Sequence, residues 1–98
     1  MSREKNDNTT GTADYAHMRR MIANGKVEGM DLLFDTYATT LLSVILRLVP
    51  DLERAEEILI DLIERVWKDR NELPRSNDVF FTWLIAKTRE SVDGYFLS

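Results

Sequence analysis

The sequence contains no cysteine and a single histidine, His17. Disulfides and thiolate metal sites are therefore excluded, and this absence is compatible with a reducing cytoplasm. A lone histidine, without a glycine-rich phosphate loop or a cluster of metal ligands, gives no support for catalysis. We expect a non-enzymatic, cytoplasmic protein with no cofactor and no metal.

Long apolar runs and a positive net charge are also missing. No stretch reaches the roughly 18 consecutive apolar residues of a membrane-spanning helix, and the polar start, MSREKNDNTTGTAD, cannot act as a secretory signal. We expect no membrane insertion. The formal charge of -4 argues against coating of nucleic acid by the whole surface, because neutralising phosphates needs clustered lysine and arginine. It leaves room for a local basic site.

Proline and glycine are scarce, with two and four copies in 98 residues, so few positions interrupt a helix. Residues 1–13 have no hydrophobic period, and we expect them to form a flexible polar leader. From residue 14 onward apolar residues repeat with helical spacing, without strand-like alternation. The sequence therefore predicts an all-α domain over residues 14–98, a compact bundle of about four helices.

Gly25 and Pro50 mark the ends of the first two predicted helices. Asp14 is placed to cap a short helix and Gly25 to end it. The second helix should run over residues 27–49, because proline disfavours helix in the residue before it. Its wide apolar stripe predicts burial on more than one side, by Met30, Leu33, Phe34, Tyr37, Ala38, Leu41, Leu42, Val44, Ile45, Leu46, Leu48 and Val49.

A third helix is predicted over residues 52–70, with Asp51 in its cap or first turn, where a carboxylate suits the helix dipole. One face should be buried, formed by Ala55, Ile58, Leu59, Leu62, Ile63 and Val66. The opposite face spans about 80° of a helix that turns ~100° per residue, and it carries Glu53, Glu57, Asp61, Glu64 and Lys68. Its plain interpretation is a solvated surface with an i,i+4 pair of Glu64 and Lys68.

The segment NELPRSND predicts a loop over residues 71–78, in which Ser76, Asn77 or Asp78 caps a fourth helix. That helix should turn inward Phe81, Leu84, Ile85, Thr88, Val92 and Tyr95. Its solvent side should carry Lys87, Arg89, Glu90 and Asp93.

Two long segments, MDLLFDTYATTLLSVILRLVPDLERAEEILIDLIERVWKD and FFTWLIAKTRE, resemble region 2 of extracytoplasmic-function sigma factors. The family pattern is F..LYD.Y...L...A.RL, then D...AED.VQE.F...W, a loop and F..WL..IARN. The resemblance covers roughly residues 14–97 and rests on three blocks in the right order. The matching residues are Leu33, Phe34, Asp35, Tyr37, Leu41, Arg47 and Leu48, then Ala55, Glu56, Glu57, Ile58, Asp61, Arg65, Val66 and Trp67, then Phe80, Trp83, Leu84 and Arg89.

The resemblance implies a sigma region 2-like domain that acts in bacterial transcription initiation. In such factors the third helix binds the clamp coiled coil of the RNA polymerase β′ subunit, and an anti-sigma factor is a further expected partner. Carboxylates spaced along one helix face can meet arginines of a partner helix, which steers association and fixes register. The expected polymerase-binding residues are Glu53, Glu57, Ile60, Asp61, Glu64 and Arg65.

The resemblance also implies that the loop and last helix recognise and open the promoter minus-ten element. A pocket for an extruded base needs aromatic or apolar walls, polar groups that read the base edge, and cations for the phosphates. The expected DNA-binding residues are Arg75, Ser76, Asn77, Phe81, Trp83, Lys87 and Arg89. The plainer interpretation is that the aromatic residues belong to the core and the polar ones cap a helix.

The sequence departs from the family pattern in four ways. Ile60 replaces a glutamine, Glu90 replaces an asparagine, the end SVDGYFLS lacks arginines, and no second helix-turn-helix domain follows before Ser98. A carboxylate at position 90 would repel DNA phosphates. Two interpretations stay open: a domain of a longer sigma factor, or a short sigma-like decoy that binds an anti-sigma factor or polymerase without opening DNA. A generic helical interaction module is the rival outside the family.

Overall fold

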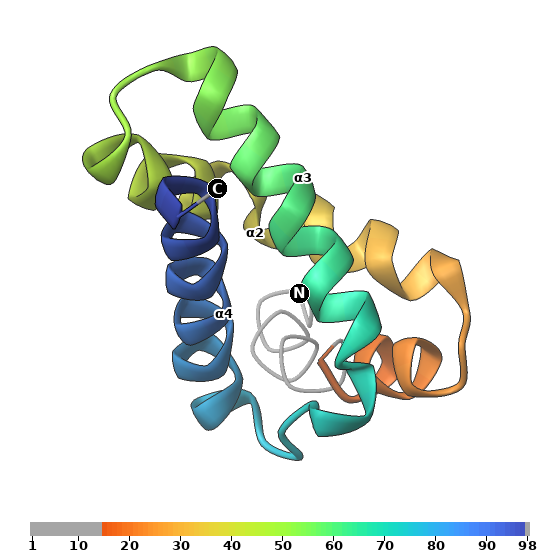
Figure 1. Cartoon of the computed structure of the whole chain (residues 1–98). Helices are drawn as coiled ribbons and strands as arrows, with labels where there is room; N and C mark the ends of the chain where they lie inside the picture. Colours follow the sequence, from red (N-terminus) through yellow and green to blue (C-terminus); the bar gives the residue numbers. More distant parts are fainter. Residues whose placement is uncertain (1–14, 98) are drawn as a thin grey trace, which may run out of the picture.

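The computed structural model describes residues 15–97, and these residues contain four α-helices, one short 3-10 helix and no strand. The all-α class predicted from the sequence is therefore confirmed. Residues 1–13 and Asp14, the predicted leader and cap, lie outside the described range. In chain order the elements are an N-terminal helix over residues 15–23, α2 (Val27–Leu48), α3 (Leu52–Lys68), a short 3-10 helix η1 (Arg70–Glu72) and α4 (Asn77–Leu97) (Figure 1).

Gly25 ends the N-terminal helix, as predicted. Its φ of +80° is a left-handed conformation that glycine adopts without strain. The amide of Gly25 donates to the carbonyl of Ile22 at 2.9 Å, and the amide of Lys26 donates to that of Met21 at 2.8 Å. These two bonds satisfy the last carbonyls of the helix in the arrangement of a Schellman motif. The chain then turns directly into α2.

Gly29 permits the close approach of α2 to the N-terminal helix. A Cβ atom at this position would lie 2.6 Å from Cγ1 of Ile22, a distance that side chains do not tolerate. Ile22 and the neighbouring Met30 are both buried. The absence of a side chain at residue 29 thus lets the two helices bury their apolar residues against each other.

The break between α2 and α3 follows the sequence signals at Pro50 and Asp51. Helix α2 ends at Leu48, and the Asp51 side chain accepts a hydrogen bond from the amide of Arg54 at 3.3 Å. This bond satisfies one of the free amides in the first turn of α3, which is the predicted cap.

Helix α3 is packed against both α2 and α4. Its predicted inner face is confirmed at five positions, whereas Ile63 is only half-buried. The α2 side of this core includes Leu33, Leu41 and Ile45, and the α4 side includes Leu84 and Val92; the buried residues of α3 are Ala55, Ile58, Leu59, Leu62 and Val66. Because apolar surface is buried on two sides of α3, this helix holds the domain together.

The α2 helix is less buried than its sequence predicted. Phe34 is 42% exposed and Leu48 is half exposed, and both were expected to lie in the core. Of the described helices, α2 alone is long and apolar enough to cross a membrane, by length and composition. Core helices of soluble proteins share this property, and here Leu33, Leu41 and Ile45 pack inside the domain.

Phe80 is the inward-facing aromatic residue of α4, in place of the predicted Phe81. The Phe80 ring is fully buried, whereas the Phe81 side chain is exposed. The centroid of the Phe80 ring lies 4.8 Å from that of Tyr15 and 5.6 Å from that of Tyr37. It lies 6.0 Å from the ring of Trp83, which is also on α4. Phe80 therefore joins the N-terminal helix and α2 to α4, and the prediction was wrong by one residue.

Replacement of Leu59 by aspartate should unfold the domain. Leu59 is 6% exposed, and an unpaired buried charge costs several kcal/mol against a total stability of about 5–15 kcal/mol. The control is Ile60→Asp, because the adjacent Ile60 side chain is 61% exposed and should accept a charge. Circular dichroism and thermal melts of both variants test the assignment. A Leu59→Asp protein that melts like the wild type would show that this face does not form the core.

Candidate functional site

Three carboxylates on the outer face of α3, those of Glu53, Glu57 and Glu64, form what we call the acidic ridge. All three residues are exposed, as predicted. Within residues 15–97 none of them forms a salt bridge, and Glu64 does not pair with Lys68. The i,i+4 ion pair of Glu64 and Lys68, which the plain interpretation of this face as a solvated surface predicted, is therefore not formed. The ridge thus presents to solvent three carboxylates that have no salt-bridge partner within the described residues.

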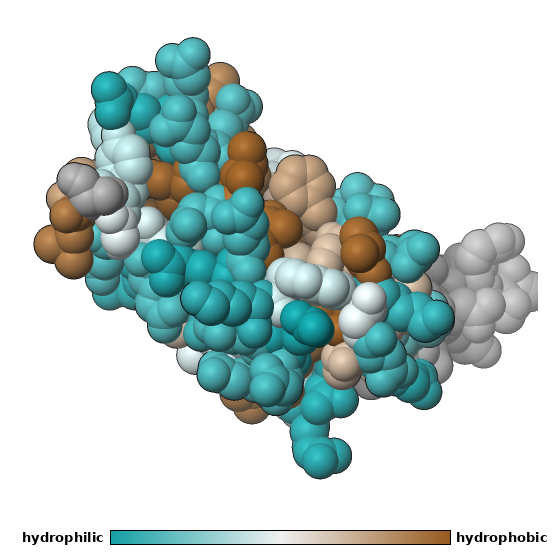
Figure 2. Space-filling model, turned by 45° about the vertical axis from the view of Figure 1, so that its right-hand side comes forward, coloured by the Kyte–Doolittle hydropathy of each residue, from teal (hydrophilic) through white to brown (hydrophobic). Residues whose placement is uncertain are grey.

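A long hollow beside the ridge lies between α2 and α3, and we call it the α2–α3 groove. It contains a cavity of about 810 Å³, lined by Val27, Met30, Asp31, Phe34, Asp35, Ile60, Ile63, Glu64 and Trp67. A neighbouring cavity of about 350 Å³ shares Phe34 and Ile60 with it and adds Ala38, Thr39, Leu42, Glu56 and Leu59. In the space-filling view apolar side chains reach the surface as an irregular band bordered by hydrophilic ones (Figure 2).

Within residues 15–97, the charged residues that line the α2–α3 groove are all acidic. Asp31 and Asp35 come from α2, and Glu56 and Glu64 come from α3. None of these four forms a salt bridge with any residue of the described chain. The groove is thus an apolar trough with uncompensated negative charge on both sides.

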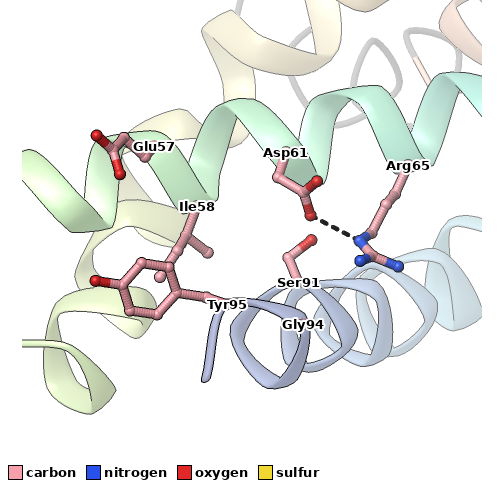
Figure 3. A pocket seen from close by; sticks show the side chains of 7 residues that line it. All are labelled: Glu57, Ile58, Asp61, Arg65, Ser91, Gly94 and Tyr95. Carbon is pink, nitrogen blue, oxygen red and sulfur yellow. Dashed lines mark hydrogen bonds and ion pairs between the residues drawn. The ribbon is translucent and has the colours of Figure 1, made fainter. Parts of the chain in front are cut away.

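Asp61 and Arg65 lie at the edge of α3 that faces α4, with the Asp61 side chain 46% and the Arg65 side chain 36% exposed. Nε of Arg65 donates to Oδ2 of Asp61 at 2.7 Å (Figure 3). Nη1 of Arg65 lies 4.0 Å from Oε1 of Glu90 on α4. The hydrogen bond to Asp61 raises the pKa of Arg65 above its ordinary value. Both residues lie at the edge of α3 because their helix positions point past the ridge toward α4.

A smaller hollow between α3 and α4, the α3–α4 groove, has a volume of about 350 Å³ and is lined by Glu57, Ile58, Asp61, Arg65, Ser91, Gly94 and Tyr95 (Figure 3). Ser91 was not predicted as a site residue. Its Oγ atom is buried and has no hydrogen-bond partner within the described residues. Sequence reasoning missed it because a helical serine commonly bonds its own backbone or water.

Lys87 is buried, whereas we predicted that it faces solvent as a cation for DNA phosphates. The residue is 7% exposed, and Nζ lies 2.6 Å from Oδ2 of Asp69. Carboxylate oxygens of Glu72 and Glu90 each lie 3.6 Å away. The hydrogen bond to Asp69 raises the pKa of Lys87, and it lowers the pKa of Asp69. A buried ammonium requires such partners, so Lys87 ties η1 and the end of α3 to α4.

The loop before α4 is fixed from the N-terminal helix. The hydroxyl of Tyr15 donates to the carbonyl of Pro74 at 2.5 Å, and Nε of Arg19 donates to the same oxygen at 2.8 Å. The loop continues with Arg75 and Ser76, and α4 begins at Asn77. All three residues are exposed. Among the other predicted DNA-binding residues, Phe81 and Arg89 are exposed and Trp83 is half-buried.

A cavity of about 430 Å³ opens next to this loop. Tyr15, Tyr37 and Asn77 line it, together with His17, Met18, Leu32 and Thr36. Burial raises the pKa of both tyrosine hydroxyls, so they stay protonated near neutral pH. Of the seven predicted DNA-binding residues, only Asn77 lines this cavity.

Comparison of the chain with protein-family models, with curated proteins and with solved structures found no match.

The ion pairs of Lys87 should make stability depend on pH at both extremes. A lysine with a raised pKa contributes stability that is complete below its ordinary value of 10.5 and is lost as pH rises through the folded-state value. An aspartate with a lowered pKa contributes stability that is lost as pH falls below its ordinary value of 3.8. We expect Lys87→Met to lower the melting temperature by several degrees at neutral pH. In this variant the melting temperature should also fall less steeply as pH rises into the alkaline range.

Thermal melts over the full pH range, with the exposed Lys68→Met variant as control, test the role of Lys87. If the melting temperature of Lys87→Met fell with rising pH as steeply as that of the wild type, the ion pairs of Lys87 would not cause the alkaline loss of stability.

Replacement of Ser91 by alanine should leave stability unchanged or raise it by up to about 1 kcal/mol, because a buried hydroxyl without a partner opposes folding. Thr88→Val provides the comparison, since the Thr88 hydroxyl donates to the carbonyl of Leu84 at 2.8 Å. Urea denaturation gives both values. If Ser91→Ala were the more destabilised of the two, the Ser91 hydroxyl would have a partner in solution.

Proposed function

We propose that this chain is a docking domain of the sigma region 2 type, which binds the clamp coiled coil of the RNA polymerase β′ subunit. The observation that carries the proposal is the apolar α2–α3 groove, open along the acidic ridge and bordered by carboxylates without a basic partner within residues 15–97. Exposed apolar surface next to uncompensated charge is typical of a site that another protein covers.

The chemistry of the groove fits a basic amphipathic helix of a coiled coil. Such a helix presents an apolar stripe, which the groove can bury against Phe34, Ile63 and Trp67. Lysines and arginines beside that stripe meet carboxylates of α2 on one side and of α3 on the other. A second copy of this chain fits less well, because its own groove would bring further carboxylates against these.

Ile60 gives the polymerase contact a different character from that of the family pattern. The family has a glutamine at this position, whereas Ile60 is 61% exposed and lines both cavities of the groove. We propose that Ile60 adds apolar contact area in place of a side-chain hydrogen bond. Asp61 and Arg65 hold each other beside α4, so the ridge and the groove rim provide the contacts with the partner.

A second proposed function is capture of a base from the promoter minus-ten element, as the sigma resemblance implies. The cavity beside Asn77 supports it, because tyrosine rings form part of its wall and an amide lies at its edge. Arg75 and Arg89 are exposed and can meet phosphates. Lys87 is left out of this proposal, since three carboxylates surround its ammonium.

An anti-sigma factor is the alternative partner. A single basic amphipathic helix has the same chemistry as one helix of a coiled coil, so the α2–α3 groove would serve a sigma-like decoy equally well. Binding to polymerase without melting of promoter DNA distinguishes a decoy from an initiation factor.

Reversal of one rim charge tests the polymerase proposal. We expect Glu64→Arg to weaken binding to a β′ clamp coiled-coil fragment about tenfold, which corresponds to about 1.4 kcal/mol. Asp93→Arg is the matched control, because Asp93 is an exposed carboxylate on α4, outside the groove. Calorimetry measures both affinities. Equal affinities for the two variants, or no binding by the wild type, would remove the support for this docking site.

A further inference from the structure

The α3–α4 groove is a separate hollow from the α2–α3 groove, and of the acidic ridge only Glu57 lines it. Ile58 and the ring of Tyr95 form an apolar part of its lining, and Glu57 and Asp61 bring two carboxylates (Figure 3). Among the described residues, Arg65 is the one cation that lines it. The described lining thus carries two carboxylates and one cation, and Glu57 forms no salt bridge within residues 15–97. Next to the lining, the Arg54 guanidinium donates to the Tyr95 hydroxyl.

Arg65 is held at one end of the groove. The Nε atom of Arg65 donates a hydrogen bond to Oδ2 of Asp61. A Cβ atom added at residue 94 would lie only 2.9 Å from Nη2 of Arg65. Gly94 thus gives the guanidinium room to lie over α4. The Ser91 hydroxyl lies next to the Asp61 carboxylate, and Glu57 and the Tyr95 ring lie on the side of Asp61 away from Arg65 (Figure 3).

The Ser91 hydroxyl is the observation that points to a ligand. Ser91 is 2% exposed, and its Oγ atom has no hydrogen-bond partner within the described chain. The side chain points from α4 toward Asp61 in the groove (Figure 3). A buried hydroxyl without a partner costs about 1–3 kcal/mol, and a donor placed in the groove would satisfy its lone pairs.

We propose that the α3–α4 groove binds a protonated primary amine carried on an alkyl chain. An ammonium group has three N–H donors, and the groove offers acceptors at Glu57, Asp61 and Ser91. The alkyl chain then lies over Ile58 and Tyr95, away from water. The inference shares only Glu57 with the acidic ridge of the polymerase proposal, and its other lining residues lie on the α4 side of α3 or on α4 itself.

Two sources supply this chemistry, a free polyamine and a lysine side chain of a partner protein. Diaminobutane represents the first, and N-acetyl-lysine amide represents the second. Butanediol is the neutral control, since it has the same chain length as diaminobutane without charge. Each compound is titrated into the full, isotope-labelled chain, and amide chemical shifts are followed by NMR.

We expect saturable shift changes at Ile58, Asp61, Ser91 and Gly94 with one or both amines and none with butanediol. Asp61→Asn should weaken binding about tenfold, and Ser91→Ala should weaken it several-fold in a protein that stays folded. Glu53→Gln is the matched control, because it removes a carboxylate from α3 outside the groove. Its affinity should equal that of the wild type.

The relative affinities of the two amines identify the source, and either preference supports the site. Shift changes spread along the acidic ridge, with equal weakening by Glu53→Gln and Asp61→Asn, would show diffuse attraction of cations and overturn the proposal. The absence of saturable shifts would overturn it as well. Neither result affects binding of the β′ fragment, which Glu64→Arg tests separately.

Discussion

The burial of α3 on two sides is the constraint on which the rest of the structure depends. Ile58 lies beside residues of α4, and Leu59 lies beside residues of α2. What remains of the helix surface is a narrow outer strip, and this strip carries the acidic ridge. A groove opens along each edge of the strip. Both proposed binding sites therefore follow from the packing of one amphipathic helix, α3, against two neighbouring helices, α2 and α4.

The sequence predicted well what local signals determine. Gly25 ended a helix through a left-handed backbone conformation, and Asp51 capped α3 through its own side chain. The buried face of α3 was also correct at five of its six positions, with Ile63 only half-buried. Its carboxylates and aliphatic residues separate cleanly around the helix, so the periodicity alone identifies the inner face.

The sequence predicted poorly what depends on distant partners. Two adjacent phenylalanines lie near the start of α4, and only packing against Tyr15 and Tyr37 selects Phe80 as the buried one. Lys87 was expected in solvent because its partners Asp69 and Glu72 belong to the preceding turn and 3-10 helix. The α3–α4 groove escaped prediction for the same reason, since it forms only when the two helices meet. Local periodicity does not contain this information.

The central claim is that a basic helical partner lies in the α2–α3 groove. Mapping of the β′ clamp fragment onto the isotope-labelled chain by NMR tests it most directly, because the result is read residue by residue. We expect shift changes and slowed hydrogen exchange at residues lining the groove on both helices, such as Phe34, Ile60 and Glu64. Changes confined to α4 and the loop before it would show that the partner does not lie in this groove.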